Sequence, residues 1–280
     1  AADESEQILS QTDASVSVTP DAPEGFTFDP NGSILSGTVT PDDKLVLKVY
    51  YSRNRYELKL TDGGAGIDSV NTATNSVYYG ASVEISAAVS NGYTFEKWTS
   101  ADESVLAGSE NNPYIFTMPA SAVELTASAT INRYNITYTL NGGTNDAANP
   151  SDYTVLDTVE IKQPVRLGYT FTGWTGTYED KDVVIAAGTT GDINLTATWS
   201  VNTYNVSYDL AGGSVDGTNP ETYNVHDSFT LINPTRVGYD FAGWIGSFEG
   251  ENVTVAEGTT GDLAFTAVWT ARPDTEYTVN

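Results

Sequence analysis

The sequence predicts a mainly β protein, or a small α+β one, organised as a tandem array of small repeat domains. Three observations lead to this prediction. Two segments, beginning at Tyr134 and Tyr204, match each other at a constant offset of 70 residues. Their strand-like stretches alternate polar and apolar residues with the period of two that marks a half-buried strand. The chain has 25 Gly and 17 Tyr but no Cys, a composition that suits strands and turns with aromatic cores.

The internal match extends through the whole of each copy, and about half of the aligned positions are identical. YNITYTLNGG begins at Tyr134 and YNVSYDLAGG at Tyr204, and GYTFTGWTG (168–176) corresponds to GYDFAGWIG (238–246). A more distant copy precedes them, in which NGYTFEKWTS (91–100) repeats the aromatic core. Self-similarity at a fixed period is the signature of a repeat architecture.

The repeats divide the chain into five segments. The first is a partial domain, three are repeats of which the earliest is divergent, and the last is the start of a further repeat or a tail. Their boundaries are 1–55, 56–131, 132–201, 202–271 and 272–280.

The elements can be justified in chain order. Leu45, Leu47 and Val49 alternate with their neighbours and predict a strand in the first segment. Each repeat then opens on an alternating strand such as YNITYTL, and the Gly pair that follows supplies turn positions with positive φ. Further strands are predicted at YTVLDTVEI, at the Gly-bounded GYTFTGWTG and at NLTATWSV, and no stretch has the 3.6-residue period and caps of a convincing helix.

Composition and charge exclude several functional classes. The net charge of −25 argues against binding to nucleic acid, since a run of phosphates would meet almost no cations. The absence of Cys and the presence of a single histidine, His226, exclude thiolate and multi-histidine metal sites. No apolar run approaches the roughly 20 residues that span a bilayer, so direct membrane insertion is not expected.

The Tyr-led strand, the Gly pair, the G-Y-x-F-x-G-W core and the closing T-A-x-W strand together resemble the Listeria–Bacteroides repeat, also called the internalin B-type B-repeat. Segments 132–201 and 202–271 resemble it closely, and 56–131 is similar to its divergent form. The stretch APEGFTFDP…SGTV…LVLKVYYSRN before residue 55 resembles the C-terminal half of a mucin-binding-protein-like (MucBP-like) repeat.

The resemblance implies a β-grasp-like fold for each unit and an elongated array. It also implies a secreted protein of the bacterial cell surface, mostly of Gram-positive bacteria, attached to the cell wall through regions outside this segment. Such repeats carry no known catalytic residues, so the resemblance implies neither an enzyme nor a cofactor.

Aromatic residues at repeated positions are candidates either for the core or for a sugar-stacking platform. A domain of roughly 70 residues has few large apolar side chains and must bury them, so the core is the favoured interpretation. The predicted core set comprises Trp98, Trp174, Trp244, Trp199, Trp269, Tyr169, Tyr239, Phe171 and Phe241.

Four further residues are candidates for ligand contact. Tyr153 and Tyr223 are expected to lie more openly on the surface. Arg166 and Arg236 recur in an arginine-poor chain, and each could bind an acidic sugar, pair with a carboxylate or pack over an aromatic ring.

Acidic residues offer weaker candidates. Asp192 and Asp262 in the repeated GTTGD motif either cap a turn or contribute to a Ca²⁺ site, and turn capping is the default because the dense acidic pattern of a Ca²⁺ loop is missing. Asp42-Asp43 and Asp102-Glu103 vary between units, and nothing in units this small suggests the cleft that a glycosidase needs.

Two functions remain in competition. The favoured one is a non-catalytic extended stalk of a surface protein, which could assist adhesion. The alternative is an adhesin module that binds host glycans, mucin or other surface proteins through exposed Tyr and Arg side chains. A strand around Glu276–Val279 is also expected to pair end to end with the open edge of a neighbouring molecule.

Overall fold

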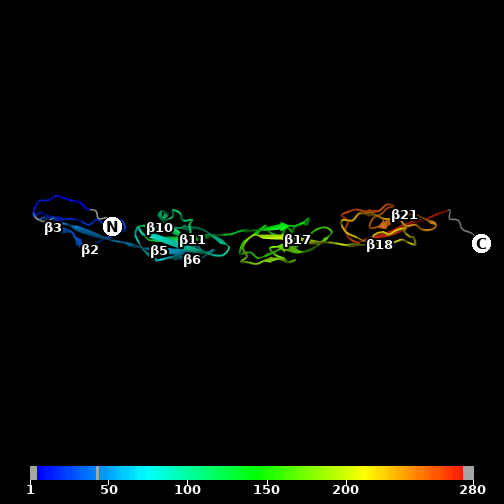
Figure 1. Ribbon diagram of the computed structural model, residues 1–280, viewed down its shortest axis with the longest axis horizontal. Helices are drawn as coiled ribbons and strands as arrows, with labels where there is room; N and C mark the ends of the chain where they lie inside the picture. The colour runs from blue at the N-terminus through cyan, green and yellow to red at the C-terminus, as the bar shows by residue number, and fades with distance from the viewer. Residues whose placement is uncertain (1–4, 42–43, 274–280) are drawn as a thin grey trace, which may run out of the picture. The chain divides into compact units, whose positions relative to one another are not determined.

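The computed structural model describes residues 5–41 and 44–273, and the predicted mainly β fold is confirmed (Figure 1). The single helical segment of this described part is a 3₁₀ turn, η1 (Glu103–Val105). The chain divides into two compact units, Ala1–Asn132 and Arg133–Asn280. The expected pair Asp42-Asp43 and the expected strand around Glu276–Val279 lie outside the described residues.

The N-terminal segment of the first unit consists of two antiparallel strand pairs. They are β1 (Ser15–Ser17) with β3 (Ser36–Thr38), and β2 (Phe26–Ile34) with β4 (Lys48–Arg53). The strand predicted from Leu45 onward therefore begins later, at Lys48, and continues to Arg53.

The first repeat completes this unit with two sheets. The four-stranded sheet has the order β7 (Ser76–Tyr78), β5 (Arg55–Asp62), β11 (Val123–Ile131) and β9 (Tyr93–Thr99). The three-stranded sheet has the order β10 (Tyr114–Thr117), β8 (Ser82–Val89) and β6 (Ile67–Thr72).

The second unit contains two repeats with the same strand order. In the first of them the sheet runs β13 (Asp152–Tyr153), β12 (Tyr134–Thr139), β17 (Ile193–Val201) and β15 (Tyr169–Gly176), with a small pair β14 (Val159–Glu160) and β16 (Val184–Ile185). In the other it runs β19 (Thr222–Tyr223), β18 (Tyr204–Asp209), β23 (Leu263–Ala271) and β21 (Tyr239–Gly246), with β20 (Phe229–Thr230) and β22 (Thr254–Val255).

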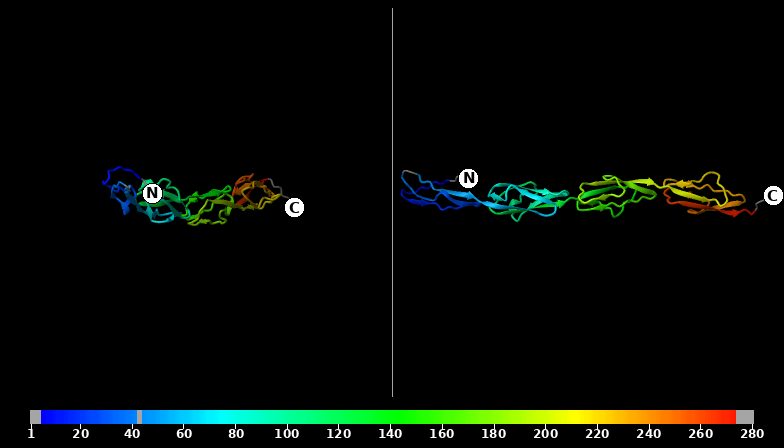
Figure 2. Two further views of the ribbon diagram at one scale, coloured as in Figure 1. Left: turned by 60° about the vertical axis from the view of Figure 1, so that its left-hand side comes forward. Right: turned by 90° about the horizontal axis from the view of Figure 1, so that it is seen from below.

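The first and last strands of each repeat are neighbours and run parallel. The three pairs are β5 with β11, β12 with β17, and β18 with β23. Ile136 on β12, for example, lies opposite Ile193 on β17. Because both strands run in the same direction, the chain enters a repeat at one end of its sheet and leaves at the other (Figure 2).

Each repeat has its own core around one tryptophan. Trp98, Trp174 and Trp244 are each 1% exposed and belong to three separate clusters of buried side chains. Each ring lies opposite a small residue of the neighbouring strand, as Trp174 does with Ala197, and this leaves room for the indole. The favoured core interpretation of these three tryptophans agrees with their burial.

A β-bulge gives the aromatic strand its inward face. In β15 the register shifts between Phe171 and Gly173, and Thr172 is the extra residue. Phe171 and Trp174 are three residues apart and would face opposite sides of a regular strand, but the bulge turns both toward the core. The same shift occurs between Phe241 and Gly243.

Candidate functional site

The turn between successive repeats is formed in the same way throughout the described chain. In each case the N–H of the residue after the last strand donates to the carbonyl of the Gly that precedes the aromatic strand. The pairs are Asn54 with Gly25 (2.9 Å), Asn132 with Gly92 (2.9 Å), Asn202 with Gly168 (2.9 Å) and Arg272 with Gly238 (3.0 Å). We call each such pair a junction clamp.

Side chains reinforce the clamp. The Thr170 hydroxyl donates to Asn202 Oδ1 at 2.6 Å, and equivalent bonds join Thr27 to Asn54 and Thr94 to Asn132. In the last repeat the Arg272 guanidinium donates to Asp240 at 2.8 Å instead. Sequence analysis did not identify this junction, and the recurring Gly-aromatic-Thr motif is the signal that could have revealed its structure.

The junction inside the second unit holds two repeats in direct contact. A Cβ on Gly168 would lie 1.9 Å from Val225 Cγ1 of the following repeat, so only glycine admits this approach. The Tyr169 hydroxyl lies 2.6 Å from His226 Nε2, and the two rings meet edge to face at 5.9 Å.

The first unit repeats this arrangement. A Cβ on Gly25 would lie 2.2 Å from Tyr79, whose ring meets Phe26 edge to face at 6.0 Å. Tyr79 and Val225 occupy equivalent positions in their repeats. In each repeat the opening tyrosine pairs with a residue of the next strand in the sheet, and Tyr79 or Val225 is the second residue after that partner. The two contacts therefore form one recurring joint.

Arg166 and Arg236 stack on tyrosine rings. The guanidinium carbon of Arg166 lies 3.7 Å from the centre of the Tyr169 ring, and that of Arg236 lies 3.9 Å from Tyr239. Arg236 also donates to the Ala211 carbonyl at 3.0 Å. Of the three expected roles, the structure thus shows packing over an aromatic ring, a cation–π contact.

Tyr153 and Tyr223 are not where the sequence analysis placed them. The expectation that they are open on the surface is wrong, because they are only 1% and 2% exposed. Their hydroxyls donate to the carbonyls of Gly191 and Gly261 at 2.7 and 2.6 Å, and burial raises the pKa of each phenol. These rings fill the core and leave no face for a surface ligand.

The remaining predicted core residues are buried to different degrees. Phe171 is buried, whereas Phe241, Trp199 and Trp269 are half-buried against the core clusters. Tyr169 and Tyr239 are also half-buried, but they lie beneath the arginines instead of in a core cluster.

The second glycine of the Gly pair has a packing role that the turn signal did not reveal. A Cβ on Gly143 would lie 2.5 Å from the Trp199 ring, and one on Gly213 would lie 2.4 Å from the Trp269 ring. The indole N–H groups of Trp199 and Trp269 donate to Leu140 and Leu210 carbonyls at 3.0 and 3.1 Å.

Asp192 and Asp262 cap the opening strand of their repeats. Asp192 Oδ1 accepts the backbone N–H of Asn135 at 2.8 Å, and Asp262 does the same for Asn205. Across the described ranges, no group of three or more His, Asp and Glu side chains is arranged to hold a metal ion. The arrangement is that of a backbone cap.

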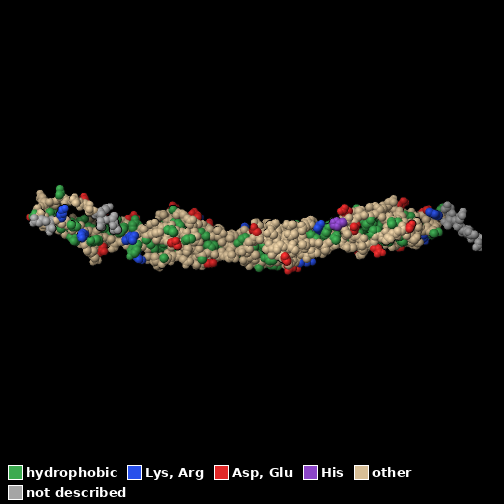
Figure 3. All heavy atoms as spheres, in the orientation of Figure 1, with side chains coloured by type: hydrophobic (Ala, Val, Ile, Leu, Met, Phe, Trp, Pro, Cys, Tyr) green, Lys and Arg blue, Asp and Glu red, His purple; other side chains and the backbone are tan. Residues whose placement is uncertain are grey.

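The charged surface is acidic, with few cations. Figure 3 shows Asp and Glu side chains scattered over the visible face and a largely uncharged area over the second repeat. In this repeat the exposed residues of β12 and β17 are uncharged, including Thr137, Thr139 and Asn194. Among the helices of the described residues, none is long and apolar enough to cross a membrane.

Comparisons with known proteins agree with this geometry. Residues 56–132 match the model of the divergent InlB B-repeat domain, and residues 134–198 and 204–268 match that of the Listeria–Bacteroides repeat domain. Together the two models cover about three quarters of the chain.

Two proteins of Evansella cellulosilytica are similar over long stretches. One, which carries the provisional name of a Gly-rich membrane protein, is 26% identical over 260 residues, or 88% of this chain. The other, provisionally named a membrane protein, is 29% identical over 162 residues, or 54% of the chain. The chain spans only 29% and 22% of the lengths of these two relatives.

Proposed function

This chain belongs to the family of Listeria–Bacteroides and divergent InlB B-repeats, and we propose that it is a non-catalytic stalk of a bacterial cell-surface protein. In this role the repeats separate a distal part of the protein from its attachment to the cell wall of a Gram-positive bacterium and assist adhesion by bearing tension. No step of catalysis is assigned to it.

The observation that carries the proposal is the parallel pairing of the first and last strand in every repeat. Tension on a chain that enters on β12 and leaves on β17 pulls these neighbours along each other in opposite directions. Their ladder of hydrogen bonds is then loaded all at once, in shear, and several bonds must break together. A repeat of this topology is suited to transmit force without opening.

The joints support the same function. The junction clamps leave almost no free chain between repeats, and the contact of Gly168 with Val225 restricts bending at the joint in the second unit. Nearest-neighbour packing of this kind is how repeat proteins gain stiffness. The net charge of −25 adds self-repulsion, which favours an extended chain and keeps it soluble.

Surface location rests on the relatives. Both Evansella proteins carry names that place them at a membrane, and a tandem array of this kind suits a region held outside the cell. The glycan-binding alternative has lost two of its four residues, since Tyr153 and Tyr223 are buried. Of the four, Arg166 and Arg236 remain half-exposed.

Single-molecule stretching tests the proposal directly. Pulled by its two ends, the chain should show one unfolding event per repeat, each releasing about 70 residues and therefore roughly 200 Å or more of contour length. Because the native chain has no Cys, handles attached through introduced cysteines are specific.

A change in pulling direction supplies the control. Handles at Asn135→Cys and Asn194→Cys, both exposed and near the same end of β12 and β17, load the ladder one bond at a time. Unfolding of the second repeat should then require clearly less force than end-to-end pulling. Equal forces in the two geometries would contradict a role in bearing tension.

A further inference from the structure

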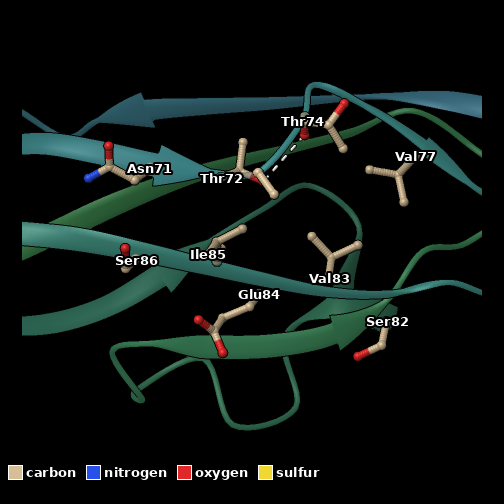
Figure 4. Close-up of a pocket in the computed structure, with 10 residues that line it drawn as sticks. Asn71, Thr72, Thr74, Val77, Ser82, Val83, Glu84, Ile85 and Ser86 are labelled. Atoms are coloured by element: carbon tan, nitrogen blue, oxygen red, sulfur yellow. Dashed lines mark hydrogen bonds between the residues drawn. The ribbon is translucent and has the colours of Figure 1, made fainter.

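The first repeat contains a pocket that lies outside the joints and the parallel strand pair. Its volume is about 280 Å³, and it opens between the end of β6, the edge strand β7 and the beginning of β8 (Figure 4). The lining residues are Asn71, Thr72, Ala73, Thr74, Val77, Ser82, Val83, Glu84, Ile85 and Ser86.

Comparison of the repeats shows which side chains differ beside this space. Val77 lies opposite Tyr56 in the sheet, and the same register position holds Tyr153 opposite Tyr134 and Tyr223 opposite Tyr204. Six residues further along, Val83 corresponds to Phe229 of the third repeat.

In the third repeat these two positions carry rings that touch. Tyr223 and Phe229 meet edge to face with their centres 6.0 Å apart, and Tyr223 is 2% exposed. The first repeat has valine at both positions, Val77 and Val83, and both line the pocket. The pocket thus adjoins a place where the homologous fold accommodates aromatic side chains.

The lining combines an apolar wall with a polar rim. Val77, Val83 and Ile85 are buried, and Figure 4 shows them around the opening with Thr72 and Thr74 above it. The Thr72 hydroxyl is bonded to the Thr74 carbonyl at 3.3 Å. The only charged lining residue is Glu84, so an anionic ligand would meet repulsion and no cation.

We propose that this pocket binds a neutral phenolic ring, with the ring against the accessible edges of Val77 and Val83 and the phenol hydroxyl toward the Asn, Ser and Thr rim. An engineered apolar cavity of about 150 Å³ accepts benzene, so the volume here is sufficient for a substituted ring. The ligand is either a free small phenol or a tyrosine side chain presented by a peptide.

The test is a titration of the full chain with p-cresol, followed by amide chemical shifts. Shifts should concentrate at residues 71–86, with a Kd in the millimolar range that is usual for a ligand of this size. A second titration uses a short uncharged peptide with one central tyrosine. Tighter binding of the peptide would identify the tyrosine side chain as the ligand, and tighter binding of p-cresol a free phenol.

Variants that fill the pocket supply the matched controls. Val77→Tyr and Val83→Phe introduce residues that the third repeat holds at these positions, so both should fold, and each should weaken p-cresol binding by about tenfold or more. The reverse change in the third repeat, Tyr223→Val with Phe229→Val, should create a second site. Unchanged affinity in the filled variants, or no shifts at residues 71–86 in the native chain, would overturn the proposal.

Discussion

The buried tryptophans of the three repeats differ by one hydrogen bond. Trp244 Nε1 donates to Asn233 Oδ1 at 3.1 Å. Among the described residues, Trp98 Nε1 and Trp174 Nε1 have no partner. In the second repeat Gln163 stands at the position of Asn233, but its amide donates to Asp182 at 2.8 Å. The longer side chain has thus turned outward and left the indole unpaired.

This difference predicts a stabilising substitution. Gln163→Asn should supply the missing acceptor to Trp174 and raise the free energy of unfolding of the second repeat by about 1 kcal/mol. Urea unfolding followed by tryptophan fluorescence measures it. The reverse change, Asn233→Gln, is the matched control and should destabilise the third repeat by a similar amount. A destabilised Gln163→Asn protein would contradict the assignment of the bond.

Two partly buried tyrosines should make the free energy of unfolding depend on pH in alkaline solution. Burial raises the pKa of Tyr138 and of Tyr208 to about 12, and their hydroxyls donate to Pro150 and Pro220 carbonyls. The unfolded chain loses these protons near pH 10, whereas the folded chain holds them until about pH 12. Their contribution to stability is therefore complete below pH 10 and is lost as the pH rises to 12.

Tyr138→Phe with Tyr208→Phe checks this directly. At pH 7 the variant should be less stable, since it lacks two hydrogen bonds each worth about 1 kcal/mol. Between pH 10 and 12 its free energy of unfolding should fall less steeply than that of the native chain. Denaturant unfolding at a series of pH values gives both quantities, and identical slopes would show that the pKa values are not raised.

At the scale of the element, the aromatic strand and its glycine form the joint. Gly168 has a φ of +76°, so any side chain there is strained by the backbone and also meets Val225. Gly188 separates these two effects, because it has a φ of +89° but nothing within 4 Å of the place of its Cβ.

Gly168→Ala should therefore loosen the joint, whereas Gly188→Ala should only strain its own turn. NMR relaxation of the full chain should show more independent tumbling of the second and third repeats in Gly168→Ala alone. Adding Val225→Ala to Gly168→Ala removes the clash and should restore part of the coupling. If the two single variants tumble alike, the joint does not depend on the absent Cβ.

At the scale of the whole molecule, the chain has several cores instead of one. The buried clusters of the three repeats share no residue. The four ion pairs within the described part are all exposed, and such pairs contribute little to stability. Stability therefore resides in each repeat separately, with nearest-neighbour terms at the joints.

Removal of one central ring tests this independence. Trp244→Ala leaves a cavity in the third repeat and should cost that repeat about 3–5 kcal/mol. Hydrogen exchange should show amide protection lost across residues 204–271 but retained in residues 56–132. Loss of protection in both regions at the same denaturant concentration would mean that the chain unfolds as a single cooperative unit.

Much of this fold could be predicted because it repeats. The 70-residue offset, the alternating strands and the recurring Trp positions predicted a β repeat array with aromatic cores, and these are local properties of the chain. The repeated tryptophans are core residues because a domain this small must bury its few large rings.

The predictions that were wrong concern side chains whose burial depends on strands distant in the sequence. The alternation of residues around Tyr153 is compatible with an exposed side chain. Its pairing with Tyr134, however, directs the Tyr153 ring into the core. Phe171 and Trp174 lie in the core as predicted, but they share a face only because a bulge shifts the register against β17. Periodicity within one strand contains no information on its partner, so neither the burial of Tyr153 nor this bulge could be derived from it.

The sequence by itself determined the β class, the repeat period, the acidic surface and the central rings, since composition and spacing are enough for these. The tertiary structure alone decided the parallel pairing of end strands, the joint between Gly168 and Val225, and the pocket beside Val77. All three arise from contacts between residues far apart in the chain, whose geometry depends on which strands become neighbours.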